Sequence, residues 1–449
     1  MSGVPESSVP QLRSVTRPLL TDGELPELLA FADPQQPLYW NRGDRGAVGI
    51  GEAIRLEFSG AHRFTEASRM WRRIAAAANI ENHVGLPGTG LLAFGTFAFD
   101  ARSEHVSVLI VPRSIIGRSG NEMWRTEVSV ADAGTGAASD TGTPVSNAEA
   151  PVATPFAAWE AIELDSPEAF AAATGCVPKS PCTVAGYTAG VVESVRRIDA
   201  GDLEKVVLSR QLEGRIAADA DIRTPLARLS AEYLNCWTFA IDGLVGSSPE
   251  TLARVINGKF EARVLAGTRP RTGLTEVADQ AVRAELLASD KDQHEHAFAA
   301  QSVVTTLSPH LTELTTSEAP FALQLPNVWH LATDVRAQLA EDVTTLELVA
   351  AMHPTAAIGG TPTAEAVEVI HELEQFDRGR YSGAVGWIDG NGDGEWVIAL
   401  RCAQLGGAVD GTRSIVASAG GGLVAGSDPE HELLETVSKF RPITTAFGA

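Results

Sequence analysis

Apolar residues recur along the chain with two periods, one typical of strands and one typical of helices. Between Leu91 and Pro112, apolar alternation and short apolar runs predict strands of a first sheet. Residues 203–216 read as a further strand, and residues 413–424 as another that runs into glycines. Residues 381–405 read as two strands joined by a Gly/Asn/Asp turn. Strands are therefore expected in both halves of the chain.

Three helices are predicted after residue 154. Residues 191–198 place four β-branched side chains on one helical face, and Gly201 stands where a C-terminal cap is expected. A longer helix is expected from about residue 282 to 311, because Ala and Leu are dense there and charges recur every three or four positions. A final helix is expected over residues 429–440.

The order of these elements leaves the number of domains open. A chain of 449 residues exceeds the size at which one core usually stops growing, so two domains or one large two-sheet domain would both fit. Residues 1–15 are rich in Ser and Pro and read as a mobile tail. Residues 16–165 read as an N-terminal sheet region. Within it, residues 131–154 fall to Ala, Gly, Ser, Thr and Asp, which predicts a surface loop.

Composition then narrows the classes of function. Subtracting 57 acidic from 35 basic residues leaves a net charge of −22, which repels nucleic acid and anionic membranes. No apolar stretch approaches the roughly 18 residues that span a bilayer, and the first residues lack an apolar signal core, so we expect a cytoplasmic protein. The four cysteines are scattered and form no CxxC pair. An anionic substrate would therefore need a local cationic pocket.

Two cations occur inside predicted strands among small or apolar neighbours. Arg401 is either an edge residue that reaches solvent or a buried cation that awaits an anion. Lys205 precedes three apolar residues and shares a strand face with Val207 and Ser209. Burial would lower its pKa toward neutrality, where a lysine can act as a general base. The alternative is an edge-strand lysine that prevents aggregation.

Carboxylates on predicted helices offer oxygen ligands for a metal ion. The segment KDQHEH at 291–296 is no zinc motif, because its two histidines are two positions apart and point in different directions. Its Glu295 could join Glu432 and Glu435, which share one face of the final helix with Lys439 one turn further on. Oxygen ligands from two helices suit magnesium. Solvated charges that pair locally are the alternative.

Other motifs carry little weight alone. The string at 389–394 matches the opening of a calcium-binding loop, but Leu400 stands where that loop needs a bidentate Glu, so we expect a hairpin turn. The glycine-rich segments 266–268 and 419–422 could bring backbone amides close to a carboxylate or phosphate, or could be simple turns. Glu250 is an acid beside a predicted turn.

Taken together, the motifs resemble the chorismate-utilising enzymes, which include isochorismate synthase, salicylate synthase, anthranilate synthase component I and aminodeoxychorismate synthase. Nine segments carry the resemblance in chain order: EKVVLSR (204–210), SSPETL (247–252), LAGTRPR (265–271), SDKDQHEH (289–296), HLATDV (330–335), HPTAAIGGTP (353–362), FDRGRYSGAVGW (376–387), ALRCA (399–403) and SAGGGLVAGSDPEHELLETVSK (418–439). Weaker matches at 94–100 and 111–118 look like the isochorismate synthase branch. The resemblance implies an α+β fold, one large unit of two packed antiparallel sheets with flanking helices, in which residues 180–445 bind chorismate.

The resemblance also implies catalytic roles. Lys205 would be the base that activates the water attacking C2 of chorismate, and Glu250 the acid that protonates the departing C4 hydroxyl. Glu295 and Glu435 would bind Mg²⁺, with Glu432 near the ion, and the ion would hold the ring carboxylate.

Substrate binding is implied for a further set of residues. They would form a cradle for the pyruvyl carboxylate and line the rest of the pocket: Tyr381, Arg401, Gly420, Gly421 and Gly422 in the cradle, and Gly267, Thr268, His330, Ala357 and Lys439 around it.

Differences among the family members favour water as the nucleophile. Anthranilate synthases usually carry glutamine where this chain has Lys205 and depend on a glutaminase subunit, which we do not expect here. The segment that holds a reactive lysine in aminodeoxychorismate synthases reads VLAGT at 264–268. Salicylate synthases resemble one another in having threonine where this chain has Ala357.

The expected function is therefore magnesium-dependent conversion of chorismate to isochorismate, for menaquinone or siderophore biosynthesis. Salicylate synthase, anthranilate synthase component I and an inactive family member that only binds a carboxylate ligand are the alternatives.

Overall fold

The structure, a computed structural model, describes residues 9–19, 25–130, 152–174, 182–271, 275–324 and 328–448. Contacts between Cα atoms divide the chain into two compact units. The first unit contains Met1–Thr251, His353–Gly390 and Trp396–Ala449, and the second contains Leu252–Met352 and Asn391–Glu395. Within the described ranges, the side chains of four residues are not described: Thr268, Glu295, Phe298 and Val328.

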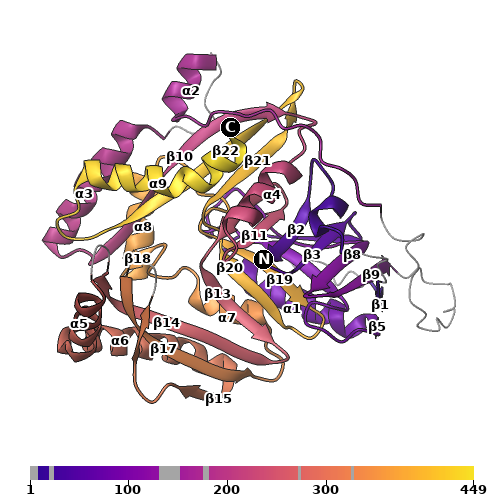
Figure 1. The fold of residues 1–449 in the computed structure, drawn as a ribbon, viewed down its shortest axis with the longest axis horizontal. Coiled ribbons are helices and arrows are strands. Elements are labelled where there is room, and N and C mark those ends of the chain that lie inside the picture. Colours follow the sequence, from indigo (N-terminus) through magenta and orange to yellow (C-terminus); the bar gives the residue numbers. More distant parts are fainter. Residues whose placement is uncertain are drawn as a thin grey trace, which may run out of the picture. The chain divides into compact units, whose positions relative to one another are not determined.

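A twelve-stranded sheet is the main feature of the first unit (Figure 1). Among the strand pairs with a described register, all pairs in this sheet are antiparallel except β1–β5, which is parallel. The strands, in their order across the sheet, are β18 (Gly360–Thr361), β10 (Lys205–Ala217), β22 (Thr412–Leu423), β21 (Cys402–Val409), β12 (Leu244–Ser248), β11 (Trp237–Ile241), β2 (Leu38–Arg42), β3 (Arg45–Ile50), β8 (Ser114–Ser119), β9 (Glu122–Val130), β1 (Leu12–Pro18) and β5 (Asn79–Asn82).

The pairing of β10 with β22 determines which residues lie close together in the first unit. The register runs without a shift from Val206, opposite Leu423, to Ala217, opposite Thr412. Residues directly opposite each other in an antiparallel pair share a face. Gly422 and Gly420 therefore lie on the same face as Val207 and Ser209, whereas Gly421 lies on the other face. The glycines of β22 thus lie beside the start of β10.

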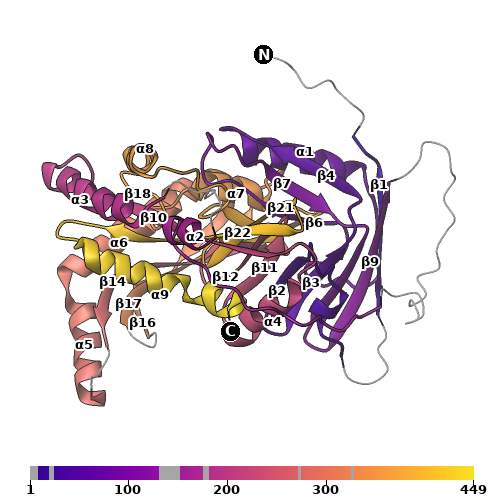
Figure 2. The same ribbon diagram turned by 90° about the horizontal axis from the view of Figure 1, so that it is seen from above.

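Helix α9 (Pro429–Phe447) runs along β22 on the Gly421 face of the sheet (Figures 1 and 2). It begins at Asp428, whose carboxylate accepts a hydrogen bond of 2.9 Å from the His431 amide. Phe440 and Ile443 on α9 are buried in one cluster with Ala417 and Ala419 of β22. Small residues on the strand allow the helix to approach closely. Burial of each large apolar side chain contributes about 1.5–3 kcal/mol.

The remaining elements of the first unit surround this sheet. A second set of strands follows the order β20 (Gly394–Ile398), β19 (Ala384–Asp389), β6 (Leu92–Thr96), β7 (Ser107–Val111) and β4 (Ile54–Phe58), with β20 entering this unit at Trp396. The helices are η1 (Leu28–Phe31), α1 (Arg63–Ala77), α2 (Pro167–Thr174), α3 (Val184–Ala200), α4 (Arg223–Glu232) and α8 (Thr363–Leu373).

The second unit pairs its own strands and carries its own helices. The strands follow the order β15 (Leu311–Thr316), β17 (Val328–Leu339), β14 (Lys259–Pro270) and β13 (Thr251–Ile256), and β16 (Phe321–Gln324) also pairs with β17. The helices are α5 (Glu276–Ala288), α6 (Asp290–Leu307), η3 (Ser308–His310) and α7 (Thr345–Met352). Helix α6 packs on β14.

The helix predictions are confirmed in position and corrected in length. Helix α3 ends at Gly201, which adopts a φ of +83° and caps the helix as predicted. The long helix predicted over 282–311 is wrong as a single element: α5 ends and α6 begins at Ser289, whose hydroxyl accepts from the Asp292 amide at 3.3 Å. A serine that caps a new helix start interrupts the old one.

The predicted tail and loop fall partly outside the description. Residues 1–8 of the tail and 131–151 of the loop are not described. The tail prediction is wrong from Leu12 onward, because Leu12–Pro18 forms strand β1 between β9 and β5. Leu12 and Val15 are buried there, and this contact with distant strands has no signal in the local composition.

The predicted fold class is confirmed. The chain is an α+β protein with two large, mainly antiparallel sheets and flanking helices. No helix of the described residues is long and apolar enough to span a lipid bilayer.

Candidate active site

Lys205 is the first residue of β10, and its position answers the question that the sequence left open. Strand β10 lies between β18 and β22, with Lys205 opposite Thr361, so this lysine is not on an edge strand. Its side chain crosses Gly422: a Cβ on that glycine would lie 2.8 Å from the Lys205 Cε atom. Burial lowers the pKa of the Lys205 amine, with the nearby Glu250 raising it and Lys439 lowering it further. A half-buried lysine with a lowered pKa can act as a base.

Glu250 follows strand β12 and is held by its backbone. The Glu250 amide donates to the Ser248 hydroxyl at 3.3 Å, and its carbonyl accepts from the Ile398 amide at 3.0 Å. The carboxyl group itself has no hydrogen-bond partner among the described residues. Burial raises the pKa of this carboxyl, against the opposing charges of Arg401 and Lys205. The group is thus suited to carry a proton.

Arg401 occupies a break between two strands, which corrects the sequence prediction of a continuous strand through this position. Strand β20 ends at Ile398 and β21 begins at Cys402. Arg401 adopts a φ of +48°, in the left-handed region, and its carbonyl accepts from the Ser247 amide at 3.1 Å. Such a backbone costs of order 1–3 kcal/mol and persists only where surrounding contacts hold it. The half-buried guanidinium lies close enough to Glu250 to lower the pKa of that carboxyl, and it makes no ion pair with any described residue.

The first turns of α9 bring two carboxylates to the opposite face of the glycine strand. A Cβ on Gly421 would lie 3.0 Å from Oε2 of Glu432 and 3.7 Å from Oε1 of Glu435. Ser427 donates to Oε1 of Glu432 at 2.8 Å, whereas Oε2 is buried without a hydrogen-bond partner in the described part of the chain. A buried, unpartnered carboxylate oxygen next to a second carboxylate is a suitable donor set for an oxygen-preferring cation.

Lys439 connects this carboxylate pair to the strand. Its Nζ lies 2.5 Å from Oε1 of Glu435 and donates to the Gly420 carbonyl at 2.7 Å. The same ammonium group lowers the pKa of Lys205. The two lysines therefore lie close enough for the charge of Lys439 to add to the effect of burial on the Lys205 pKa.

Tyr187 was missed by the sequence reasoning. It lies on α3, is 4% exposed, and its hydroxyl has no hydrogen-bond partner within the described residues. That hydroxyl lies 3.9 Å from the position of a Cβ on Gly421. Burial and the charge of Glu432 raise the pKa of the phenol, so it remains a hydrogen-bond donor. The available signal was that Tyr187 shares one buried helix face with Gly190, Val191 and Ser194. Such periodicity predicts burial but does not show which groups lie near the tyrosine hydroxyl.

Tyr381 and Ala357 lie in loops of the first unit. Tyr381 is buried, and burial raises the pKa of its phenol to about 12. Its neighbour Ser382 has a φ of +58° and donates its amide to the Ala399 carbonyl at 2.9 Å. Ala357 is exposed in the segment before β18, and the Gly359 carbonyl of that segment accepts from the Val207 amide at 2.9 Å. One loop is thus bonded to the strand that carries Lys205, and the other to the break between β20 and β21 that contains Arg401.

Four predicted site residues belong to the second unit. Gly267 has a φ of +75° at a register shift in β14, where a Cβ would lie 3.3 Å from the Asp292 side chain. Thr268 pairs with His330 across β14 and β17. Glu295 is on α6, but its side chain lies outside the description. Among described side chains, no three His, Cys, Asp or Glu residues gather around a common point.

Two motifs have structural roles in the second unit. His296 is buried, with its ring bonded to Thr333 Oγ1 at 2.7 Å and to the Ala266 carbonyl at 3.2 Å, so it is committed to packing α6 on the sheet. In the 389–394 turn, the Asp393 carboxylate accepts from the amides of Asn257 and Gly258. The hairpin-turn prediction for this string is confirmed.

Comparisons with known proteins show what this chain is similar to. A family model described as chorismate binding enzyme matches residues 7–448. The isochorismate synthase DhbC of Bacillus subtilis strain 168 is 41% identical over 276 residues, which cover 58% of this chain and 67% of that protein. A salicylate biosynthesis isochorismate synthase of Pseudomonas aeruginosa is 30% identical over an alignment that covers 100% of this chain and 94% of that protein.

The fold has solved counterparts. The structure of MenF, the menaquinone-specific isochorismate synthase of Escherichia coli, superposes with a TM-score of 0.69 and covers 98% of this chain and 95% of that one. The sequence identity is 22%, so this likeness supports the fold alone.

Proposed function

The chain belongs to the chorismate binding enzyme family, and we propose that it is an isochorismate synthase that converts chorismate to isochorismate. One observation supports this most directly: an amine with a lowered pKa and a carboxyl with a raised pKa, Lys205 and Glu250, lie within each other's electrostatic influence. Arg401 lies near Glu250 and makes no ion pair with the described residues. Two titratable groups whose pKa values are shifted in opposite directions are suited to be base and acid at one site.

In the proposed reaction Lys205 removes a proton from water as that water adds to C2 of chorismate. Glu250 donates its proton to the C4 hydroxyl, which leaves as water while the ring double bonds shift. The atoms balance, because one water adds and one departs. The raised pKa of Glu250 keeps the proton available, and the lowered pKa of Lys205 keeps its lone pair available.

The pyruvyl carboxylate is assigned to Arg401 and the Gly420–Gly422 strand. Arg401 makes no ion pair with the described residues, so its charge is available to a substrate anion. A glycine run lets an incoming ligand approach the backbone closely. Tyr381 completes the cradle as a neutral phenol, since burial raises its pKa to about 12.

Magnesium is assigned to Glu432 and Glu435, whose carboxylates both face Gly421. The buried, unpartnered Oε2 of Glu432 fits a hard cation, and two carboxylates without a cysteine or histidine suit magnesium. When bound, the ion would supply positive charge to hold the ring carboxylate. Glu295, Gly267, Thr268 and His330 stay sequence-based predictions for the same reaction.

Product analysis of chorismate incubated with the purified protein tests the proposal. The experiment includes Mg²⁺, with and without ammonium salt, and resolves isochorismate, salicylate and anthranilate by chromatography against an enzyme-free control. We expect isochorismate in both mixtures. Salicylate as the main early product would make this chain a salicylate synthase, and anthranilate formed only with ammonium would make it an anthranilate synthase component I.

A carboxylate-binding protein without activity is the remaining alternative. Chorismate binding by calorimetry with no product under any of these conditions would support that reading and overturn the proposed activity.

A further inference from the structure

A cavity of about 570 Å³ lies in the first unit, formed by residues distinct from those of the candidate active site. Its walls are mainly polar, with Asp33, Gln35, Gln36, Glu52 and Arg55 among their residues, and Leu38, Ile110 and Leu405 form smaller apolar parts. A Cβ on Gly407 would meet no atom within 4 Å, so the backbone there borders open space. The cavity is large enough for a small organic molecule.

Arg413 on β22 lines this cavity and is only 8% exposed. Its Nε donates to the Gly406 carbonyl at 2.9 Å and its Nη1 to the Gln35 carbonyl at 2.6 Å. The second terminal nitrogen, Nη2, donates to no described residue, and no carboxylate of the described chain pairs with this guanidinium. Burial lowers the pKa of Arg413 without any compensating charge. Two carbonyls hold this guanidinium and leave Nη2 open to a further acceptor, and a bond to a carboxylate there would be stronger than one to a neutral group because both partners are charged.

The other charged groups around the cavity are matched. Asp242 pairs with Arg55 at 2.8 Å and with Arg380 at 2.6 Å, and Glu52 lies 3.7 Å from Arg55. Asp33 accepts from the amides of Gln35 and Gln36 at 2.9 and 2.8 Å. Among the described residues of this wall, Arg413 is therefore the cation without an ion pair.

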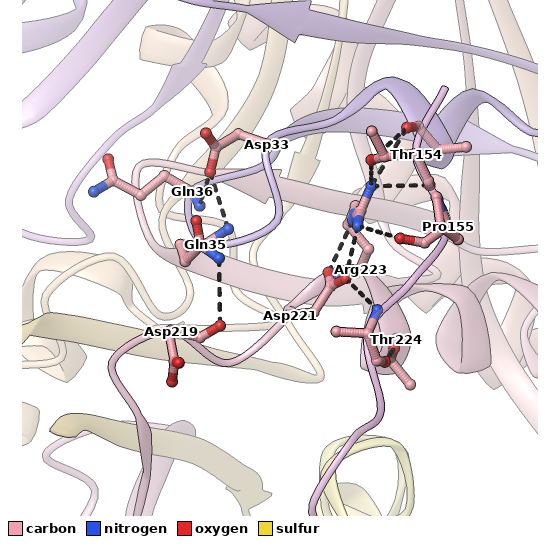
Figure 3. Close-up of polar contacts among 11 residues, drawn as sticks. Asp33, Gln35, Gln36, Thr154, Pro155, Asp219, Asp221, Arg223 and Thr224 are labelled. Carbon is pink, nitrogen blue, oxygen red and sulfur yellow. Dashed lines mark hydrogen bonds and ion pairs between the residues drawn. The ribbon is translucent and has the colours of Figure 1, made fainter. Parts of the chain in front are cut away.

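Arg223, by contrast, is a buried arginine whose guanidinium has a carboxylate partner and a full set of hydrogen bonds. Figure 3 shows its guanidinium bonded to both oxygens of Asp221 and to Thr154 and Pro155. Every nitrogen of Arg223 has a partner. Arg413, which is also buried, has two carbonyls and no carboxylate.

The turn that contacts Arg413 is preorganised. Besides the two amide bonds to Asp33, the Gln35 side chain donates to the Asp219 carbonyl at 3.3 Å (Figure 3). Gln35 is thus held at both its backbone and its side chain, and its carbonyl points at Arg413. A ligand would find the arginine already oriented, which reduces the entropy cost of binding.

We propose that this cavity binds a small monocarboxylate, whose carboxylate accepts from Nη2 of Arg413. Leu38, Ile110 and Leu405 offer apolar contacts to the rest of the ligand. A single negative charge fits better than two, because Asp33 lines the same cavity and its carboxylate has amide partners but no ion pair with any described residue. The site is separate from the one assigned to chorismate and does not depend on the proposed activity.

Titration calorimetry with benzoate at constant ionic strength tests this site. Benzamide serves as the uncharged control of the same shape, and inorganic phosphate as the dianion control. We expect saturable binding of benzoate but not of benzamide or phosphate. Arg413→Met should weaken benzoate binding by about 10- to 100-fold, the range for loss of a charge-assisted hydrogen bond, and Arg413→Lys should weaken it less.

Two further variants keep the result interpretable. Gly407→Leu should fill part of the cavity while leaving the bonds of Arg413 in place, so it tests the site even if Arg413→Met unfolds. Arg401→Met reports on benzoate bound in the chorismate site. Unchanged affinity in both Arg413→Met and Gly407→Leu, or affinity lost only in Arg401→Met, would overturn the inference.

Discussion

At the scale of single residues, the site depends on two side chains whose titration is changed by their surroundings. Lys205 loses basicity because burial disfavours its charged form, and Glu250 loses acidity for the same reason. Each also attracts the other, which acts against both shifts. Burial is the larger effect in both cases, so the pair can exist as a neutral amine and a neutral acid.

Lys205→Ala and Glu250→Gln are each expected to lower kcat by about 10²–10⁴-fold, the usual contribution of a general base or acid. Chorismate binding, measured by titration calorimetry, should persist because other groups hold the carboxylates. Lys259→Ala and Glu430→Gln, at exposed positions, are the matched controls. If Lys205→Ala abolishes binding, then Lys205 anchors the substrate and is not the base.

The dependence of kcat on pH should be bell-shaped. Lys205 works as the neutral amine, so the rate falls as pH drops and the amine becomes protonated. Glu250 works as the protonated acid, so the rate falls as pH rises and the carboxyl ionises. The lowered pKa of Lys205 and the raised pKa of Glu250 both enlarge the fraction in the active form. A rate that keeps rising at alkaline pH, with the fold intact by circular dichroism, would contradict the role of Glu250.

At the scale of elements, a buried ion pair connects the strand of Lys205 with two loops of the site. Arg378 donates to Glu374 at 2.6 and 2.8 Å, to the Val207 carbonyl at 2.6 Å and to the Ile358 carbonyl at 2.9 Å. Glu374 in turn accepts from the amide and hydroxyl of Ser209 at 2.7 and 2.9 Å. The pair therefore connects α8 with β10 and with the segment that carries Ala357.

Arg378→Ala should lower the free energy of unfolding by about 3–5 kcal/mol, because it leaves the Glu374 carboxylate buried without its cation. Arg102→Ala, which breaks an ion pair with Glu368 whose side chains are 51% and 65% exposed, should cost about 0–1 kcal/mol. Urea denaturation measures both. Equal losses in the two variants would show that burial does not decide the strength of the Arg378 pair.

The segment before β18 should influence which product leaves. Ala357 is exposed there, so a threonine can be accommodated without repacking the core. We expect Ala357→Thr to raise the fraction of salicylate, since a bulkier hydroxylated residue could hold bound isochorismate in the conformation that loses pyruvate. Chromatography of both products over time decides this. An unchanged ratio would remove Ala357 as a determinant of product choice while leaving the main proposal intact.

At the scale of the whole molecule, a chain with a net charge of −22 is proposed to bind a dianion. Binding of a dianion to so acidic a chain is favourable only if positive charge is concentrated at the site. Arg401 and Lys439 supply part of it, and the proposed magnesium ion would supply the rest. Removal of the ion should therefore affect substrate binding as well as the rate.

Treatment with EDTA is expected to abolish turnover, and added Mg²⁺ to restore it. Glu432→Gln and Glu435→Gln should weaken Mg²⁺ binding as measured directly by calorimetry, since each removes a charged oxygen ligand. Glu430→Gln, at an exposed position two residues before Glu432 on α9, should behave as the unmodified protein. Full activity after exhaustive chelation would contradict the assignment of a metal to these carboxylates.

Features decided by neighbouring residues were predictable from the sequence. The Gly201 cap of α3, the 389–394 turn and the existence of α9 each depend on interactions within a few positions, and all are confirmed. The family resemblance likewise rests on short motifs. One error arose where distant segments decide, because Leu12–Pro18 forms a strand by pairing with β9 and β5. The other error was a local signal that was overlooked, because the helix break at Ser289 comes from a cap on Asp292, three positions along the chain.

For the candidate site, the sequence by itself determined which residue types are present and in what order: a lysine and an arginine among apolar neighbours, carboxylates at helical spacing and glycines in a strand. Only the tertiary structure decided how these groups behave. It places the strand of Lys205 between two other strands rather than at the edge of the sheet. It also holds the Arg401 backbone in the left-handed region, between two strands and near Glu250. The physical reason is that pKa values, unpaired charges and backbone strain depend on burial and on fields from residues far away in the chain, which no local pattern encodes.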